Sequence, residues 1–425
     1  MGSEERLDVW EAWLAVGAGL GVLASAVSRK LDELPLSEPL VGLAVGALLG
    51  PQAAGVLELP AGAQDRVLLV AAELTLAIAL MAIALRYPID ELRGRAPEVA
   101  WLVLLVLPAM ALLGAALSWA ALGVSMGVAL AIGAALSPTD PVLASSVVTG
   151  EPASRTLPLR LRQNLSLESG FNDGLALPLV VVAAAGVAGA SMAATVAGAL
   201  WEVVGAVALA WLLGRLAAWA LAVAVRHRDI DLSHELLYSL VLSLATLGVA
   251  ALVGVGGLLT VFVTGLVFNA HTSDEERRQE ETIDEGVNRI LILPLFVLLG
   301  VALPWQGWAE LGWRGPALGV GVLVLRRLPA VLALRPLLGA RSWLDAAWLG
   351  WFGPVGVTAV FYLLHLRELG VTDPLVWEAG SLVVTASIVA HGVTASPGRA
   401  LYGRLAPPTN RRRGGGCGTR SPRTT

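Results

Sequence analysis

Long apolar runs separated by short polar stretches dominate the chain from residue 9 to residue 396. A helix needs about 20 apolar residues to cross the hydrocarbon core of a bilayer. At that length the sequence predicts thirteen membrane-spanning helices. They cover approximately residues 9–28, 38–57, 66–85, 98–118, 123–149, 163–189, 193–225, 234–253, 255–270, 285–303, 316–334, 343–365 and 374–396. We therefore expect an all-α polytopic membrane protein, with a membrane transport domain over residues 1–406 and a disordered basic cytoplasmic tail over residues 407–425.

Basic residues are distributed unevenly between the predicted loops. Clusters of Arg or Lys follow every odd-numbered span, whereas the connections after even-numbered spans carry isolated arginines or none. Cytoplasmic loops of membrane proteins are enriched in Lys and Arg. The pattern therefore predicts a multi-pass protein of the cell membrane, with its N-terminus outside and its C-terminus in the cytoplasm.

Two of the predicted spans are interrupted by proline and glycine. Span five contains Ser137-Pro138-Thr139-Asp140-Pro141, and span twelve contains Gly353-Pro354-Val355-Gly356-Val357-Thr358. Spans seven apart cross the membrane in opposite directions, so spans 1–6 and 8–13 are expected to form two inverted-topology repeats. Broken segments at corresponding positions of two repeats favour a binding site built from half-helices.

Composition narrows the classes of function. Only 15% of the residues are charged and 56% are hydrophobic, whereas soluble domains carry about 25% charged residues. The net charge of -4 and the scattered arginines disfavour a nucleic-acid partner. The single cysteine, Cys417, offers no disulfide or thiolate metal site. With no Ser/His nucleophile pair, zinc motif or aspartyl dyad, we expect no enzyme activity and no small-molecule cofactor, and the lipid bilayer is the expected partner.

Carboxylates inside the apolar runs point to the chemistry. Asp140 lies in span five, and Glu168 and Asp173 lie in span six. Such residues cost several kcal/mol to insert, so by default they mark an ion or proton pathway. Pro138 and Pro141 remove backbone donors from the helix, which frees carbonyls such as that of Thr139 to bind a cation. The alternative is a proline kink with one capping Asp.

Span six gathers four polar groups within about one turn. Ser169 and Asp173 are four residues apart, as are Glu168 and Asn172, so each pair lies on one helix face. A buried carboxylate in such a cluster can hold a proton or a cation in alternation. The alternative is a purely structural polar network between helices.

Four further polar residues have open roles. Arg326 and Arg327 lie inside span eleven, where an arginine needs a carboxylate partner or a route to the interface. One of them is expected to pair with Glu168, and the sequence does not decide which. Glu73 either reaches the site or faces the headgroups. His391 either senses pH or packs at a helix end.

These residues resemble the monovalent cation:proton antiporter family, which contains bacterial and archaeal sodium/proton antiporters and is related to animal sodium/proton exchangers. The resemblance covers residues 10–400. Its motifs are Thr139-Asp140-Pro141, Glu168-Ser169 with Asn172-Asp173-Gly174, Phe262-Val263-Thr264-Gly265-Leu266, Phe352-Gly353-Pro354 and His391-Gly392-Val393-Thr394.

The resemblance implies a homodimer, with a scaffold and a moving core domain in each protomer. It implies that Asp173 carries cation and proton in alternation. Thr139, through its carbonyl, Asp140 and Ser169 would be further ligands of Na+ or K+, and Glu168 would act through water or an arginine. Glu73 stands where some members supply another carboxylate.

The resemblance also implies the reaction. We expect a secondary antiporter that exchanges Na+ for H+ by alternating access and serves pH and sodium homeostasis. Asn172, where electrogenic relatives have Asp, implies electroneutral exchange of one cation for one proton. Val355 replaces an arginine found in many members, which leaves the positive charge near span twelve unassigned. The alternatives are K+/H+ exchange on the same fold and, from another class, a carrier of organic anions.

Overall fold

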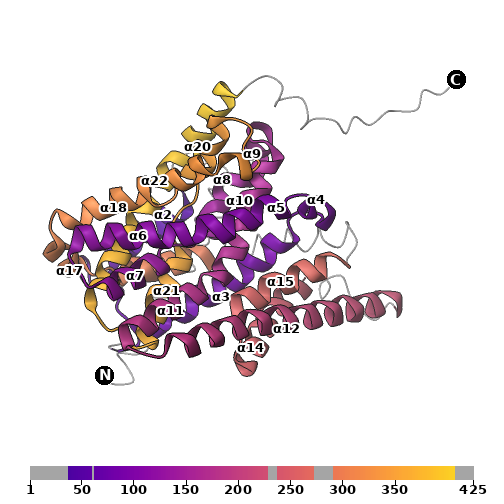
Figure 1. Cartoon of the computed structure of the whole chain (residues 1–425), viewed down its shortest axis with the longest axis horizontal. Helices are drawn as coiled ribbons and strands as arrows, with labels where there is room; N and C mark the ends of the chain where they lie inside the picture. The colour runs from indigo at the N-terminus through magenta and orange to yellow at the C-terminus, as the bar shows by residue number, and fades with distance from the viewer. Residues whose placement is uncertain (1–36, 60–61, 228–236, 272–290, 407–425) are drawn as a thin grey trace.

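Helices form all the regular structure in the described part of the chain (Figure 1). The computed structural model describes residues 37–59, 62–227, 237–271 and 291–406, and these ranges contain no β-strand. The predicted all-α class is confirmed. The first predicted span, residues 9–28, and the predicted tail, residues 407–425, lie outside the described residues.

The helices are, in chain order, α2 (Glu38–Leu49), α3 (Gln64–Leu85), α4 (Ile89–Arg93), α5 (Ala96–Trp101), the π-helix η1 (Leu102–Val106), α6 (Leu107–Leu122), α7 (Met126–Ala135), α8 (Pro141–Val148), α9 (Gly150–Thr156), α10 (Leu159–Leu175), α11 (Leu177–Ala188), α12 (Met192–His227), α14 (Tyr238–Val253), α15 (Gly257–Asn269), α17 (Trp305–Leu311), α18 (Arg314–Leu325), α19 (Leu328–Ala333), the 3-10 helix η2 (Arg335–Leu337), α20 (Trp343–Trp351), α21 (Val357–Glu368) and α22 (Pro374–Leu405). A further helix covers Leu291–Val301.

Many of these helices are long and apolar enough to cross a membrane. By length and composition, six described helical stretches qualify: α3, α5 through α6, α10 with α11, α12, α18 with α19, and α22. The helix Leu291–Val301 makes a seventh if it forms one span with α17, which it meets at 61°. The shorter apolar helices α2, α7, α14 and α15 fall within predicted spans two, five, eight and nine. The described helices therefore follow the predicted spans, while the total of thirteen and the inverted repeats remain predictions.

Both predicted breaks are present. α7 ends at Ala135 and α8 begins at Pro141, while α20 ends at Trp351 and α21 begins at Val357. Pro141 occupies the first helical position of α8, where its missing N–H has no intrahelical partner to lose. Two short non-helical segments therefore interrupt the bundle.

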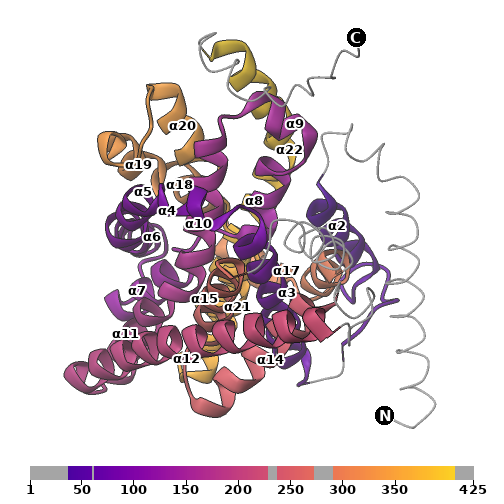
Figure 2. The same ribbon diagram turned by 90° about the vertical axis from the view of Figure 1, so that its right-hand side faces the viewer.

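The helix α10 lies between two groups of helices. α12 and α14 lie on one side of the molecule and α20 on the other (Figures 1 and 2), and α10 contacts α15 and α3 on one hand and α8 and α20 on the other. Gly170 and Gly174 face α15: a Cβ at Gly174 would lie 2.5 Å from the Leu259 Cβ, and one at Gly170 would collide with the Phe262 ring. Small residues four apart allow helices to pack closely in membranes, which brings the polar stretch of α10 to the centre.

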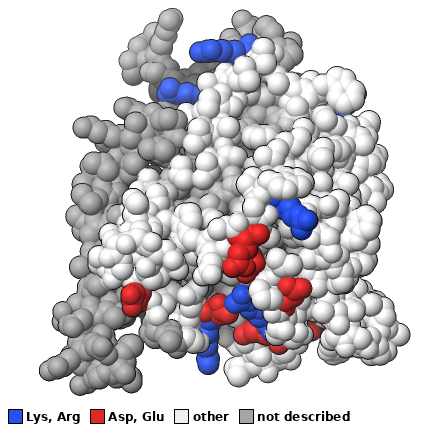
Figure 3. Space-filling view, turned by 90° about the vertical axis from the view of Figure 1, so that its left-hand side faces the viewer, with Lys and Arg blue, Asp and Glu red and all other residues white. Residues whose placement is uncertain are grey.

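The two ends of the bundle differ in charge. α4 and α9, which adjoin the basic connections, lie at one end, and α17 lies at the other (Figure 1). Most of the face that holds α17 is uncharged; most of its acidic side chains lie in the lower middle of the view beside some basic ones, and further basic side chains lie near the top (Figure 3). Ion pairs at the ends of α3 and α21 include Arg367–Asp65 and His365–Glu368.

Candidate functional site

The two breaks pass each other and are joined by Asp140. Its backbone N–H donates to the Pro354 carbonyl oxygen at 2.9 Å. Its carboxylate accepts from the backbone N–H groups of Val142 (2.7 Å) and Leu143 (2.9 Å) in α8 and of Val357 in α21. One buried carboxylate thus serves the N-terminal ends of two half-helices, where the helix dipole favours negative charge.

Arg326 serves the opposite ends. Its guanidinium donates to the carbonyl oxygens of Leu136 (2.6 Å), Ser137 (2.8 Å) and Pro138 (3.3 Å) after α7, and of Gly353 (2.6 Å) after α20. The side chain is buried. Carbonyl oxygens at helix C-termini favour a cation, so this arginine needs neither a carboxylate nor the membrane interface.

Arg327 is the arginine that pairs with Glu168. The guanidinium donates through both terminal nitrogens to the two carboxylate oxygens, the second contact being 2.7 Å, and its Nε donates to the Leu349 carbonyl at 3.1 Å. Both side chains are about 2% exposed or less. A bidentate pair of this kind occupies both carboxylate oxygens of Glu168.

The predicted ligand residues of spans five and six meet at Thr139. Its hydroxyl lies 3.1 Å from the Ser169 hydroxyl and accepts from the Asn172 amide nitrogen at 2.7 Å. All three side chains are fully buried. Arg326 takes the three carbonyls that precede Thr139 but does not contact the Thr139 carbonyl.

Asp173 differs from the other two acids. It is fully buried, and neither carboxylate oxygen has a hydrogen-bond partner among the described residues. Its nearest influences are the charge of Asp140 and the hydroxyl of Thr358. A buried polar group without a partner is costly, so this carboxylate is the one in the site that is available to a cation or a proton.

Two residues of α21 were missed by the sequence reasoning. The Tyr362 hydroxyl donates to the Asp173 backbone carbonyl, and Thr358 lies beside the Asp173 carboxylate. The signal that points to them is the break in span twelve, because α21 begins directly after it as α8 does after the break in span five.

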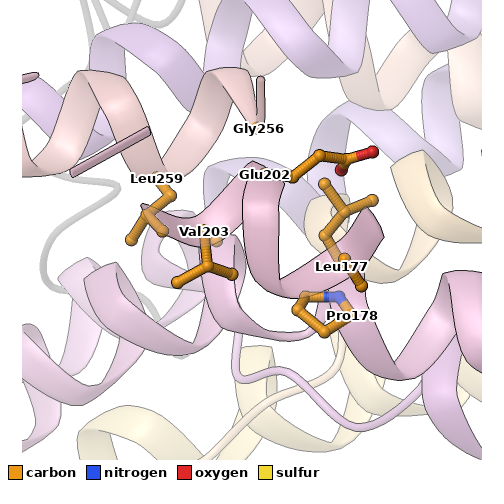
Figure 4. A pocket seen from close by; sticks show the side chains of 8 residues that line it. Leu177, Pro178, Glu202, Val203, Gly256 and Leu259 are labelled. Atoms are coloured by element: carbon orange, nitrogen blue, oxygen red, sulfur yellow. The ribbon is translucent and has the colours of Figure 1, made fainter. Parts of the chain in front are cut away.

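Glu73 lies apart from this cluster. It is half-buried in α3, near Gly257 at the start of α15, and the charges acting on it are those of His365 and Glu368. Nearby, a shallow hollow too narrow for a water molecule is lined by Gly174, Leu177, Pro178, Ala199, Glu202, Val203, Gly256 and Leu259 (Figure 4). Glu202 is an acid within the seventh apolar run, a signal that the sequence reasoning did not use.

Side chains of α22, the predicted span thirteen, form hydrogen bonds on both sides of the break between α20 and α21. The Nε2 of His391 lies 2.9 Å from the Trp351 carbonyl, and the Thr394 hydroxyl accepts from the Trp351 indole N–H at 3.2 Å. Beyond the break, the Val355 N–H donates to the Ser387 hydroxyl at 2.8 Å, and that hydroxyl lies 3.1 Å from His391 Nδ1. His391 therefore packs against the broken segment rather than facing the aqueous phase.

Comparisons with known proteins agree with this architecture. The chain is 31% identical over 377 residues to Na(+)/H(+) antiporter 2 of Zygosaccharomyces rouxii, covering 84% of this chain and 46% of that protein. It is 25% identical over 285 residues to the K(+)/H(+) antiporter NhaP2 of Shewanella oneidensis, covering 66% of this chain and 48% of that protein. The chain thus spans about half the length of these two relatives.

The fold is also that of a solved structure. The sodium proton antiporter MjNhaP1 from Methanocaldococcus jannaschii, determined at pH 8, matches with a TM-score of 0.69 and 19% identity, covering 92% of this chain and 96% of that chain. At this identity the likeness concerns the fold alone. Residues 19–398 match the family described as "Sodium/hydrogen exchanger, transmembrane". Because this match covers most of the chain, the protein belongs to the sodium/hydrogen exchanger family.

Proposed function

We propose that this protein is a secondary antiporter that exchanges Na+ for H+ across the cell membrane, one for one, with Asp173 as the single carrier. The observation that carries the proposal is the contrast between the three buried acids. Asp140 is held by backbone N–H groups and Glu168 by Arg327, whereas Asp173 has no hydrogen-bond partner among the described residues.

In the proposed transport cycle, Asp173 carries a proton in one direction and a cation in the other. On the outer side Asp173 takes a proton and releases the cation, and on the inner side it releases the proton and takes a cation. An ionised carboxylate without a partner is too costly to carry through a low-dielectric passage, so the site moves only when loaded. Thr139, Asp140 and Ser169 are the further cation ligands in this proposal.

The proposed stoichiometry depends on how many carboxylates in the site can alternate between a proton and a cation. One carboxylate alternates between one proton and one monovalent cation, while Asn172 beside it is neutral and donates to Thr139. The charge carried in the two directions is then equal, so exchange is electroneutral.

The contacts of α10 differ between its two ends. At the basic end, the Arg86 guanidinium donates to the Ser166 hydroxyl at 3.2 Å and the Gln163 amide donates to the Glu91 carboxylate at 2.8 Å. These contacts join α3 and α4 to α10. The hollow beside Gly174 lies toward the other end of α10. We infer a conformation that is closed toward the cytoplasm.

The proposed topology and oligomeric state are those implied by the resemblance to the family. We propose thirteen spans in two inverted repeats, a transport domain over residues 1–406, a cytoplasmic tail over residues 407–425, an outer N-terminus and a homodimer. The large exposed apolar side chains of α12, such as Trp201 at 71% and Trp219 at 66% exposure, suit lipid or a second copy. Glu73 stays a proposed cation ligand, for a conformation in which α3 and α10 are arranged so that Glu73 lies closer to Asp173.

Transport in proteoliposomes containing a pH-sensitive dye tests the carrier. Asp173→Asn should reduce Na+-driven proton movement to the level of protein-free vesicles, while Asp90→Asn, in an exposed acid of α4, should leave it unchanged. Exchange by Asp173→Asn at the parent rate would contradict a single carrier. A strong dependence of the initial rate on imposed membrane potential would contradict electroneutrality.

The leading alternative is K+/H+ exchange, which the name of the Shewanella relative favours. Carboxylate and hydroxyl oxygens bind both ions, so the ligand types do not distinguish the two reactions. Exchange rates measured over a concentration series of Na+, K+ and Li+ in the same vesicles show which cation is transported. A carrier of organic anions would need a cationic group free to bind its substrate. Both buried arginines of span eleven are instead engaged, with carbonyls and with Glu168.

A further inference from the structure

Thr358 touches both acids at the crossing of the broken helices. It is the second residue of α21 and is fully buried. The backbone N–H of the residue before it, Val357, donates to the Asp140 carboxylate, which places Thr358 next to that acid, and the Thr358 hydroxyl neighbours the Asp173 carboxylate. Yet neither the hydroxyl nor that carboxylate makes a hydrogen bond of normal geometry with any described residue.

A threonine hydroxyl in a helix ordinarily donates to the carbonyl three or four residues earlier. Thr75, Thr260 and Thr394 of this chain do so, to Ala71 (2.8 Å), Gly256 (2.8 Å) and Ala390 (2.7 Å).

Thr358 does not have this partner. The residue four positions earlier is Pro354, which lies in the break, and its carbonyl accepts from the Asp140 N–H. Because Pro354 lies in the break and not in a helix, the Thr358 hydroxyl lacks the helical carbonyl that these other threonines use, and it lies beside the Asp173 carboxylate without a hydrogen bond of normal geometry.

We propose that Thr358 is a ligand of the transported cation, contributed by the second repeat opposite Thr139 and Ser169. The inference rests on the proposed antiport function. A hydroxyl has one donor and two acceptor lone pairs, so it suits both states of the carrier. With a cation present, the oxygen of Thr358 binds the cation while its proton points to the ionised Asp173. With Asp173 protonated, the same oxygen accepts the carboxylic proton in a hydrogen bond.

The proposed ligand set then comes from both repeats. Thr139 and Asp140 belong to the first break, Ser169 and Asp173 to α10, and Thr358 to the start of α21. Because α21 moves with the second break, a displacement of either break changes the distance across the cation. Thr358 therefore contributes to the choice among Li+, Na+ and K+ by size.

The test compares Thr358→Val with Thr358→Ser. Valine keeps the shape and removes the hydroxyl, whereas serine keeps the hydroxyl. We expect Thr358→Val to raise the apparent KM for Na+ by about tenfold, with the maximal rate within about twofold of the parent, and Thr358→Ser to stay close to the parent. The order of KM values among Li+, Na+ and K+ should change in the valine variant.

A matched control is available in α14. Thr246 is also buried, and its hydroxyl also has no partner among the described residues, but it lies outside the crossing. Thr246→Val should leave the KM unchanged. An unchanged KM in Thr358→Val, a lower maximal rate alone, or failure of serine to restore the parent KM would each overturn the proposal.

A second measurement does not depend on turnover. In detergent, Na+ should raise the melting temperature of the parent, and this Na+-dependent rise should be smaller in Thr358→Val and kept in Thr358→Ser. Equal rises in all three would overturn the role of Thr358. These results are distinct from a failure of the antiport function, in which vesicles containing the parent protein would show no Na+-driven proton movement.

Discussion

Glu168 and Asp173 are five residues apart in α10, yet their surroundings differ. Glu168 is paired through both oxygens with Arg327, whereas Asp173 has no hydrogen-bond partner among the described residues. The sequence places two acids in one polar cluster. The position of Arg327, between α18 and α19, decides which of the two acids is paired.

The pair between Glu168 and Arg327 gives a prediction about stability. Glu168→Gln leaves a guanidinium buried without its counter-charge, which should lower the free energy of unfolding by about 3–5 kcal/mol. The double variant Glu168→Gln with Arg327→Gln should lose less than Glu168→Gln alone. Melting temperatures in detergent measure both.

The exposed pair of Arg93 with Asp90 supplies the control, because its side chains are 69% and 85% exposed. Asp90→Asn should change stability by about 0–1 kcal/mol. A double variant at Glu168 and Arg327 that is less stable than the single variant would contradict the assigned pairing.

At the scale of elements, the crossing is organised by charge at helix ends. Asp140 lies at the N-terminal ends of α8 and α21, and Arg326 lies at the C-terminal ends of α7 and α20. Val355 replaces an arginine that many members of the family have, and the sequence therefore left the positive charge near span twelve unassigned. The positive charge near the second break comes from span eleven, through the contact of Arg326 with the Gly353 carbonyl.

Removing that charge should disturb both breaks together. Arg326→Gln leaves carbonyl oxygens of two half-helices without a cation, so we expect transport to fall by about tenfold or more and the melting temperature to drop. Arg326→Lys keeps the charge but cannot reach all four carbonyls, and it should fall between the parent and Arg326→Gln. A glutamine variant with parental rate and stability would reject this role.

The contacts of span thirteen predict a second effect on the break. Ser387→Ala removes the acceptor of the Val355 N–H, and His391→Ala removes the contact with the Trp351 carbonyl. Each should raise the KM for Na+ several-fold, because the break also positions Asp140 through Pro354. Ser387→Thr, which keeps the hydroxyl, should restore the parent value.

A pH profile separates this role from pH sensing by His391. If the ring only holds the break, His391→Ala lowers transport at every pH without moving the midpoint. Arg326 and Arg327 are the charged groups acting on the ring. A protonated ring would still donate to the Trp351 carbonyl, and its Nδ1 would donate to the Ser387 carbonyl, 2.9 Å away. A shifted midpoint in His391→Ala would contradict the positional role.

At the scale of the whole molecule, the two ends of the bundle are unlike. Polar contacts join α3 and α4 to α10 at the basic end, whereas the hollow with Glu202 lies beside Gly174 (Figure 4). If the basic end is cytoplasmic, the hollow lies at the outward end of α10, next to Gly174.

Cysteine accessibility tests this orientation. With Cys417 replaced by serine, Val203→Cys in the hollow should react with a membrane-impermeant thiol reagent added outside intact cells. Ala84→Cys, in the buried inner part of α3, should not react. Labelling of position 203 only in inverted vesicles would reverse the proposed topology.

The sequence by itself determined the class and the outline of the site. Apolar runs of spanning length, proline at two breaks, and residues four apart on one helix face follow local rules of geometry. These rules hold whatever the neighbours are. The confirmed all-α class and the breaks after Ala135 and Trp351 therefore match what the sequence predicts.

Only the tertiary structure decided the partners. Arg326 and Arg327 are adjacent in sequence between α18 and α19, but Arg326 binds carbonyls and Arg327 binds Glu168. Glu73 lies away from Asp173, while Thr358 reaches it across 185 residues of sequence. Such contacts depend on how distant helices cross, and no local pattern contains that information.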